Sequence, residues 1–112
     1  MEAPTKTKKQ TRRFTRASVS LPVTVASEST NFHCQGLQLS EFGILLGSEH
    51  KEAVGKVVQL KLELESLSRS LFLSGTVAYT IDKGFGIRFK GLSEEQRTVL
   101  KDYLKGCTTR IG

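Results

Sequence analysis

The sequence has few of the residues that stabilise small secreted domains or bind metal ions. Among its 112 residues are two cysteines, two histidines, two prolines and no tryptophan. Cys34 and Cys107 stand alone and far apart, so we expect free thiols, although a disulfide between them stays open. Because CxxC, HExxH and histidines four residues apart are all missing, the sequence predicts no metal site and no cofactor.

Long apolar runs are also missing. No stretch approaches the roughly 20 apolar residues that span a membrane, and the first residues are charged rather than an apolar leader. We therefore expect a cytoplasmic protein that does not insert into membranes. A length of 112 residues, with 38% hydrophobic and 25% charged residues, suits one globular domain with one core.

The sequence also lacks a recognisable catalytic group. His33 and His50 are the only histidines, and we place the first on a strand and the second in a loop. Neither has a nucleophile or a pair of carboxylates beside it, which acid–base and covalent catalysis need. We therefore do not expect an enzyme.

Positive charge is concentrated at the N-terminus. Residues 1–16 hold six Lys or Arg and one Glu, six minus one, or +5 of the chain's net +6. Residues 1–11 have no periodicity and little to bury, so we expect a flexible basic tail, with the domain itself covering residues 12–112. Such an arm attracts polyanions, such as a nucleic acid, an anionic membrane or a phosphorylated small ligand.

Apolar and polar residues alternate through most of the remaining chain, which is typical of strands buried on one face. The pattern predicts six strands, at about 18–25, 31–40, 44–46, 57–65, 71–81 and 85–90. The side chains expected to face the core from the fifth strand are those of Leu71, Leu73, Val77, Tyr79 and Ile81. In the sixth strand Phe85 is expected to face inward, and Gly86 and Arg88 outward. Turn signals between the strands favour antiparallel pairing.

Only the end of the chain has a helical pattern. Ser93 and Gln96 fit a capping box, and Gly106 is expected to end the helix. The apolar stripe between them consists of Val99, Leu100, Tyr103 and Leu104. The predicted fold class is therefore all-β with one helix: a six-stranded antiparallel β-barrel, closed or nearly closed, capped by a C-terminal α-helix.

Two short polar stretches are candidates for a binding site. The first is the segment 12–16 (RRFTR), whose arginines can bind a phosphate or a guanine edge bidentately and can stack on a base. The second, the segment 38–43 (QLSEFG), ends the second strand. With Leu37 and Leu39 pointing into the core, Gln38 and Ser40 would point outward side by side. Gly43 would permit a positive φ or a close approach to the backbone.

These features resemble the PilZ domain family. Arg12-x-x-x-Arg16 before the first strand is similar to the family's RxxxR motif, and Gln38-x-Ser40-x-x-Gly43 is similar to its (D/N)xSxxG motif. The segment 84–89 (GFGIRF) also fits, and the likeness extends from about residue 12 to residue 104. The two motifs together, in this order, are more specific than either alone. PilZ domains are six-stranded antiparallel barrels with a C-terminal helix, and many are bacterial receptors for the second messenger cyclic di-GMP.

The resemblance implies a cyclic di-GMP site. The residues that would form it are Arg12, Arg13, Arg16, Gln38, Ser40 and Gly43. Arg12 and Arg16 would hold phosphates and guanine, and Arg13 would lie within reach of a further phosphate or stacking contact. The polar pair would hold the other side of the ligand, and the glycine would keep the turn tight. Binding would order the basic arm on the barrel, a switch that an unidentified downstream protein would read.

One position departs from the family pattern, because Gln38 stands where Asp or Asn is expected. A Gln amide oxygen accepts hydrogen bonds without charge assistance, which weakens binding by about 1 kcal/mol, or several-fold. Two alternatives therefore stay open. One is an adaptor of the same fold that has lost the ligand and acts by protein–protein contacts, for example at Phe72. The other, a nucleic-acid binder using the basic arm, is the weakest, because no row of aromatic residues is evident for stacking bases.

Overall fold

The strands and the helix expected from the sequence are present in the computed structural model, which describes residues 16–28 and 30–108. The elements are β1 (Arg16–Ala26), β2 (Asn31–Ser40), β3 (Gly43–Gly47), β4 (Val57–Leu64), the 3-10 helix η2 (Glu65–Leu67), β5 (Arg69–Ile81), β6 (Gly84–Lys90) and α1 (Glu94–Thr108). Residues 1–11 lie outside the described part, so their assignment as a flexible tail stays a prediction.

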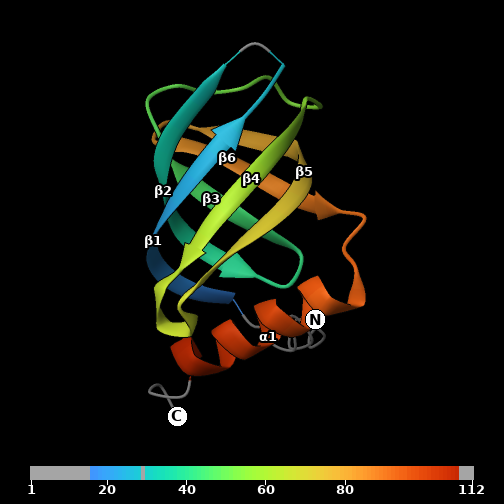
Figure 1. Ribbon diagram of the computed structural model, residues 1–112. Helices are drawn as coiled ribbons and strands as arrows, with labels where there is room; N and C mark the ends of the chain where they lie inside the picture. The colour runs from blue at the N-terminus through green and yellow to red at the C-terminus, as the bar shows by residue number, and fades with distance from the viewer. Residues whose placement is uncertain (1–15, 29, 109–112) are drawn as a thin grey trace, which may run out of the picture.

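The six strands close into an antiparallel barrel in the order β1-β2-β3-β6-β5-β4 (Figure 1). Antiparallel connections join β1 to β2, β2 to β3, β4 to β5 and β5 to β6. The pairs β3–β6 and β1–β4 then close the ring. Each described strand therefore has two paired neighbours, which leaves no open sheet edge among the described residues. The predicted fold class is confirmed.

The core lies inside the barrel and under the helix. Strand β4 shows the predicted alternation, since its inward residues Leu60, Leu62 and Leu64 are at most 2% exposed. Phe85 of β6 is fully buried. The other buried apolar side chains are Ala17, Leu21, Val23, Val25, Leu39, Ile44, Leu46, Val58, Leu71, Leu73, Val77, Ile87, Phe89, Val99, Leu100 and Leu104.

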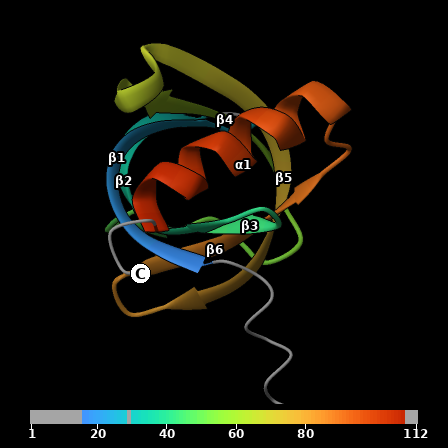
Figure 2. The same ribbon diagram turned by 90° about the horizontal axis from the view of Figure 1, so that it is seen from below.

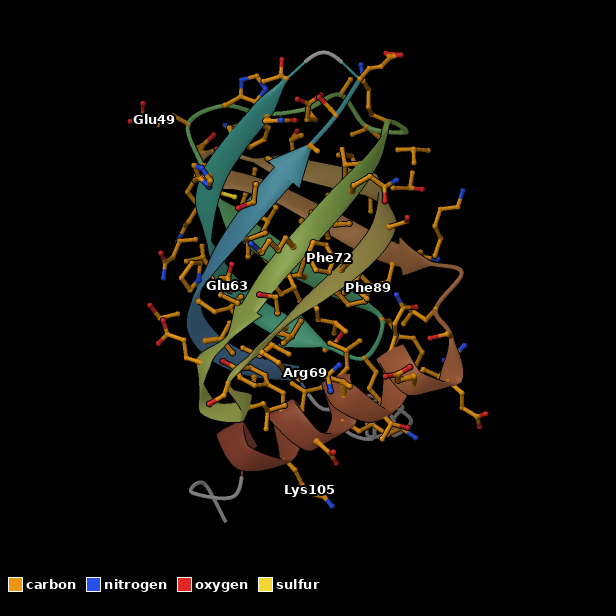
Figure 3. All side chains as sticks on the ribbon, viewed as in Figure 1. Glu49, Glu63, Arg69, Phe72, Phe89 and Lys105 are labelled. Atoms are coloured by element: carbon orange, nitrogen blue, oxygen red, sulfur yellow. The ribbon has the colours of Figure 1, made fainter. Side chains whose placement is uncertain are left out.

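Helix α1 lies across one end of the barrel (Figure 2) and packs against β1, β2 and β5. The predicted capping box is confirmed: Ser93 Oγ accepts the Gln96 N–H at 3.1 Å, and Gln96 Oε1 accepts the Ser93 N–H at 2.7 Å. The Gln96 amide also donates to the Phe72 carbonyl of β5 at 2.7 Å. Arg69, at the start of β5 beside the helix (Figure 3), lies 3.9 Å from Glu95. A hydrogen bond and an ion pair thus connect the start of the helix to β5.

The apolar stripe of α1 completes the core, with Val99, Leu100 and Leu104 buried. The predicted end of the helix at Gly106 is wrong, because the helix continues to Thr108. Gly106 does not take the positive φ with which a glycine usually ends a helix.

A β-bulge in β2 reverses the predicted orientation of Leu37. The pairing of β2 with β3 passes directly from Gly36 to Gln38, which leaves Leu37 as an extra residue. Gly36 is buried, whereas Leu37 is half-buried and packs over Gly47. The prediction that Leu37 points into the core is therefore wrong, while Leu39 is fully buried as expected. One extra residue shifts the alternation of side chains by one position.

A second bulge, in β5, turns two predicted core residues outward. The pairing with β6 passes from Val77 to Tyr79, so Ala78 is the extra residue. Val77 is 1% exposed, but Tyr79 is 48% exposed and Ile81 is 36% exposed. The prediction that Tyr79 and Ile81 face the core is wrong, because the inserted residue inverts the alternation from that point onward.

The end of the barrel opposite the helix is closed by the loop between β3 and β4 (Figure 1). Glu52 of this loop is buried, and its carboxylate lies 2.8 Å from His50 Nε2 and 3.4 Å from the Ser27 hydroxyl. The His50 ring packs on Phe32 with 4.4 Å between centroids, and Phe32 in turn packs on Phe85 at 6.3 Å. His50 therefore has a structural role at this end of the core.

Cys34 of β2 is a free thiol that packs against the core. Burial raises the pKa of this thiol from 9.0 to about 11, because the thiolate would lose its hydration. The thiolate fraction near pH 7.5 is therefore about 100-fold lower, and the greater nucleophilicity of a more basic thiolate recovers less than about 10-fold of that. We expect iodoacetamide to alkylate Cys34 at least about 10-fold more slowly than a cysteine in an unstructured peptide.

Mass spectrometry of a Cys107→Ser variant measures this rate with Cys34 as the single thiol. A rate equal to that of the peptide would contradict the half-buried, protonated state of Cys34. The Cys107 side chain itself lies outside the described residues, so its state as a free thiol stays a prediction.

Within 16–28 and 30–108, no helix is long and apolar enough to cross a membrane. In the same ranges, no group of three or more His, Cys, Asp or Glu side chains is arranged to hold a metal ion.

Candidate functional site

The turn between β2 and β3 is built around the Ser40 side chain. The Ser40 hydroxyl oxygen accepts hydrogen bonds from the N–H groups of Phe42 at 3.1 Å and Gly43 at 3.2 Å. Ser40 ends β2 and Gly43 begins β3, so Glu41 and Phe42 alone form the turn. Serine often stabilises a turn through its own neighbouring backbone in this way. The Ser40 side chain therefore holds the turn in its conformation.

Gly43 is required by a close approach of backbones rather than by a positive φ. Among the described glycines, only Gly55 and Gly91 have a positive φ. A Cβ added at Gly43 would overlap the Ile87 carbonyl oxygen of β6. The overlap arises because β3 and β6 pair here, with Gly43 opposite Arg88. The glycine thus brings β6 close to the β2–β3 turn.

The strand register joins the two candidate stretches. Arg16, the first residue of β1, pairs with Ser40, and Ser18 pairs with Gln38. Residues opposite each other on antiparallel strands have Cα atoms about 5 Å apart. The end of the RRFTR segment therefore lies directly beside the β2–β3 turn. Arg12 and Arg13 lie outside the described residues, so their place at the site stays a prediction.

A surface pocket of about 260 Å³ opens beside the turn. Gln38 and Ser40 of β2 and Arg88 of β6 supply polar lining, and Phe42 and Tyr79 supply aromatic lining. No Asp or Glu is among the described residues that line it. A pocket with a guanidinium, an amide and aromatic rings, but no carboxylate in its described lining, is suited to an anion that carries a planar polar ring.

The sequence interpretation missed two residues of this pocket, Tyr79 and Arg88. Alternation correctly places Arg88 outward, but only the β3–β6 pairing sets it opposite Gly43. Tyr79 was assigned to the core, and no sequence signal marks the bulge at Ala78 that turns it outward. The prediction that the Gln38 side chain of β2 points outward is confirmed, since Gln38 is exposed and lines the pocket.

Solved structures with this fold include those of three bacterial proteins. The PilZ domain of YcgR from Escherichia coli, solved with c-di-GMP, has a TM-score of 0.74 at 11% identity, and the match covers 89% of this chain and 93% of that one. The inhibitor of motility MotI/DgrA from Bacillus subtilis has a TM-score of 0.73 at 15% identity, with 89% of this chain and 51% of that one covered. This chain therefore spans about half the length of MotI/DgrA.

The PilZ domain of CeSA from a cellulose-synthesizing bacterium has a TM-score of 0.63 at 15% identity, with 87% of this chain and 98% of that one covered. At these low identities the three structures establish a shared fold alone.

Family membership rests on a match in sequence. None of the curated proteins matches the chain, but the profile of the PilZ domain matches residues 10–106. This range includes the arginine segment, the β2–β3 turn, all six strands and most of the helix. With nearly the whole sequence matched and the barrel closed as in solved PilZ domains, the chain belongs to the PilZ domain family.

Proposed function

We propose that this PilZ domain is a non-catalytic receptor for cyclic di-GMP, which binds in the pocket beside the β2–β3 turn together with the RRFTR segment. The observation that carries the proposal is the register of β1 and β2, which sets Arg16 opposite Ser40. The last residue of the cationic segment is thereby opposite Ser40, which lines a pocket whose described lining contains Arg88 and no carboxylate. The PilZ domain of YcgR, solved with c-di-GMP, supports the choice of ligand.

The chemistry of the ligand fits two cationic positions on the barrel wall. Arg16 pairs with Ser40, Arg88 pairs with Gly43, and the two-residue turn sets Ser40 beside Gly43. Arg16 and Arg88 are therefore in one row, three strand spacings or roughly 14 Å apart. Cyclic di-GMP carries two phosphates and two guanines in one ring, so arginines at both ends of this row can make charge-assisted hydrogen bonds to it.

Gln38 offers a test of how the site binds guanine. Gln38→Asp introduces a carboxylate that accepts charge-assisted bonds from guanine N–H groups, so we expect cyclic di-GMP to bind about 3- to 10-fold more tightly. Gln38→Asn has the same size without the charge and should give a smaller gain. Calorimetric titration of both variants measures the difference. An Asp variant that binds no more tightly than the Asn variant would contradict a guanine contact at this position.

In the proposed switch, the ligand holds the N-terminal arm against the barrel. Six cations in residues 1–16 supply the attraction, and the phosphates of the ligand give them a fixed partner on the barrel wall. The surface formed by the ordered arm differs from that of the free protein, and a downstream protein would read this difference.

A second candidate function is favoured by the departure at Gln38. A PilZ-fold adaptor that has lost ligand binding would act through protein contacts alone. Phe72 of β5 (Figure 3), which is 65% exposed beside the start of α1, would be a contact residue in that case.

Titration of cyclic di-GMP into the full chain at one fixed salt concentration distinguishes the two functions. We expect a dissociation constant in the micromolar range or below by calorimetry, and much weaker binding of GMP, which has one phosphate and one guanine. Equilibrium dialysis of the same samples guards against a binding enthalpy near zero. Absence of binding in both measurements would overturn the receptor function and leave the adaptor.

A further inference from the structure

Tyr79 is an exposed aromatic residue whose ring is held in a defined place. Its ring lies against Gly86 on the outer wall of the barrel, so closely that a Cβ added at Gly86 would overlap it. The β5 bulge at Ala78 brings Tyr79 directly opposite Gly86. Although packed on one side, Tyr79 is 48% exposed and lines the pocket beside the β2–β3 turn.

The Tyr79 atoms that lie nearest to Gly86 are two ring carbons, Cε1 and Cζ, and the hydroxyl oxygen. Within the described part of the chain, the Tyr79 hydroxyl makes no hydrogen bond. A glycine partner leaves the ring resting on bare backbone, which restricts its movement and keeps the pocket side open. A restrained aromatic ring that faces solvent in this way is suited to stacking on another planar ring.

The strand register places Tyr79 across the pocket from the polar residues of β2. Gln38 pairs with Leu45, Leu45 with Gly86, and Gly86 with Tyr79, so these positions form one row across four strands. Gln38 and Gly86 are two strand spacings apart, or about 10 Å. Arg88 lies two residues along β6 from Gly86 and therefore on the same face. The pocket thus has a ring on one side, an amide on the other and a guanidinium next to the ring.

We propose that Tyr79 is a specificity-determining residue whose ring stacks on one guanine of the bound ligand, with Arg88 beside the same base or its phosphate. This inference rests on the proposed cyclic di-GMP function and adds a base-stacking position to the site. The role of Gly86 follows directly, because any side chain there would displace the ring from the wall. Stacking on an aromatic ring recognises the face of a base, whereas Gln38 can recognise only its edge.

Four variants test the stacking role, with affinity for cyclic di-GMP measured by calorimetry. Tyr79→Ala is expected to lose about 5- to 150-fold in affinity, whereas Tyr79→Phe keeps the ring and should bind within about 3-fold of the natural protein. Gly86→Ala keeps Tyr79 but moves its ring, so it should also weaken binding. Phe72→Ala removes an exposed aromatic residue that lies outside this pocket and should leave the affinity unchanged.

A spectroscopic readout separates stacking from an indirect effect on the fold. The chain has two tyrosines, Tyr79 and Tyr103, and no tryptophan, so a Tyr103→Phe variant leaves one tyrosine signal. In that variant we expect the aromatic proton resonances of Tyr79 to move upfield when the ligand is added, as the guanine ring current requires. Circular dichroism of each variant checks that the barrel remains folded.

The outcomes distinguish this inference from the function on which it rests. Natural affinity in a folded Tyr79→Ala variant, or unmoved Tyr79 resonances at saturating ligand, would overturn the stacking role and leave the receptor function intact. An equal loss in Tyr79→Ala and Tyr79→Phe would also overturn it, because the hydroxyl would then be the group in use. Absence of cyclic di-GMP binding by the natural chain would overturn the receptor function itself.

Discussion

Replacing Arg16 with alanine is expected to weaken cyclic di-GMP binding about 10- to 150-fold. Hydrogen bonds to charged groups contribute roughly 1.5–3 kcal/mol each, which converts to that range of affinity. Arg16 is the position at which the RRFTR segment enters the barrel, since it begins β1 and pairs with Ser40. In the proposed complex, loss of its guanidinium would remove a phosphate or guanine contact, and β2 has no Lys or Arg that could replace it. Calorimetric titration at constant salt measures the change.

A matched control removes the same charge at a distance from the site. Arg97 is exposed on α1, and alanine is the best helix former, so Arg97→Ala lowers the net charge by one without disturbing the pocket. We expect Arg97→Ala to bind cyclic di-GMP within about 2-fold of the natural chain. Equal losses in both variants would mean that general electrostatic attraction, rather than a site at Arg16, holds the ligand.

Arg12→Ala extends the experiment to the other end of the RxxxR motif. If Arg12 and Arg16 hold one ligand together, each single variant should lose a similar amount. Their double variant should then retain little measurable binding.

Replacing Phe85 with alanine is expected to lower the free energy of unfolding by about 3–5 kcal/mol. This range applies to large aromatic side chains removed from a core, because lost burial and the cavity left behind both contribute. Phe85 is fully buried in β6 and packs against Phe32 at the end of the barrel opposite the helix. Since domains of this size are stable by only about 5–15 kcal/mol, the loss is a large part of the total. Urea unfolding followed by circular dichroism gives the difference.

Phe72→Ala is the same substitution on the outer face of the barrel. Phe72 is 65% exposed, and its ring lies 5.9 Å from Lys61 Nζ, so its loss should cost at most about 1 kcal/mol. The hydrogen bond from Gln96 goes to the Phe72 backbone and is unaffected by the substitution. Similar losses in the two variants would contradict the inward orientation of Phe85.

The strands, their inward residues in β4 and β6, and the helix cap were predictable from local pattern. Alternation of apolar and polar residues follows from the two-residue period of a strand, which needs no knowledge of the partner strands. Leu60, Leu62 and Phe85 are therefore buried as expected. The capping box of Ser93 and Gln96 was predictable for the same reason, since both of its partners lie within one helical turn.

The errors at Leu37, Tyr79 and Gly106 have a common origin. In β2 and β5 a bulge interrupts the alternation of side chains, and α1 extends past the glycine at which it was expected to end. The sequence around each of these positions does not specify the change. A bulge depends on how two strands must bend to close the barrel, which the sequence of one strand does not reveal.

The sequence by itself determined an all-β barrel with a terminal helix and a β2–β3 turn that carries Ser40 and Gly43. The tertiary structure alone decided which distant residues share the pocket. Arg88 lies opposite Gly43 through the β3–β6 pair, and Tyr79 reaches the same pocket through a bulge. The β1–β2 register sets Arg16 opposite Ser40, which lines this pocket. The physical reason is that alternation and turn preference act within a few residues, whereas pairing and bulge positions are set by the closure of the whole barrel around one core.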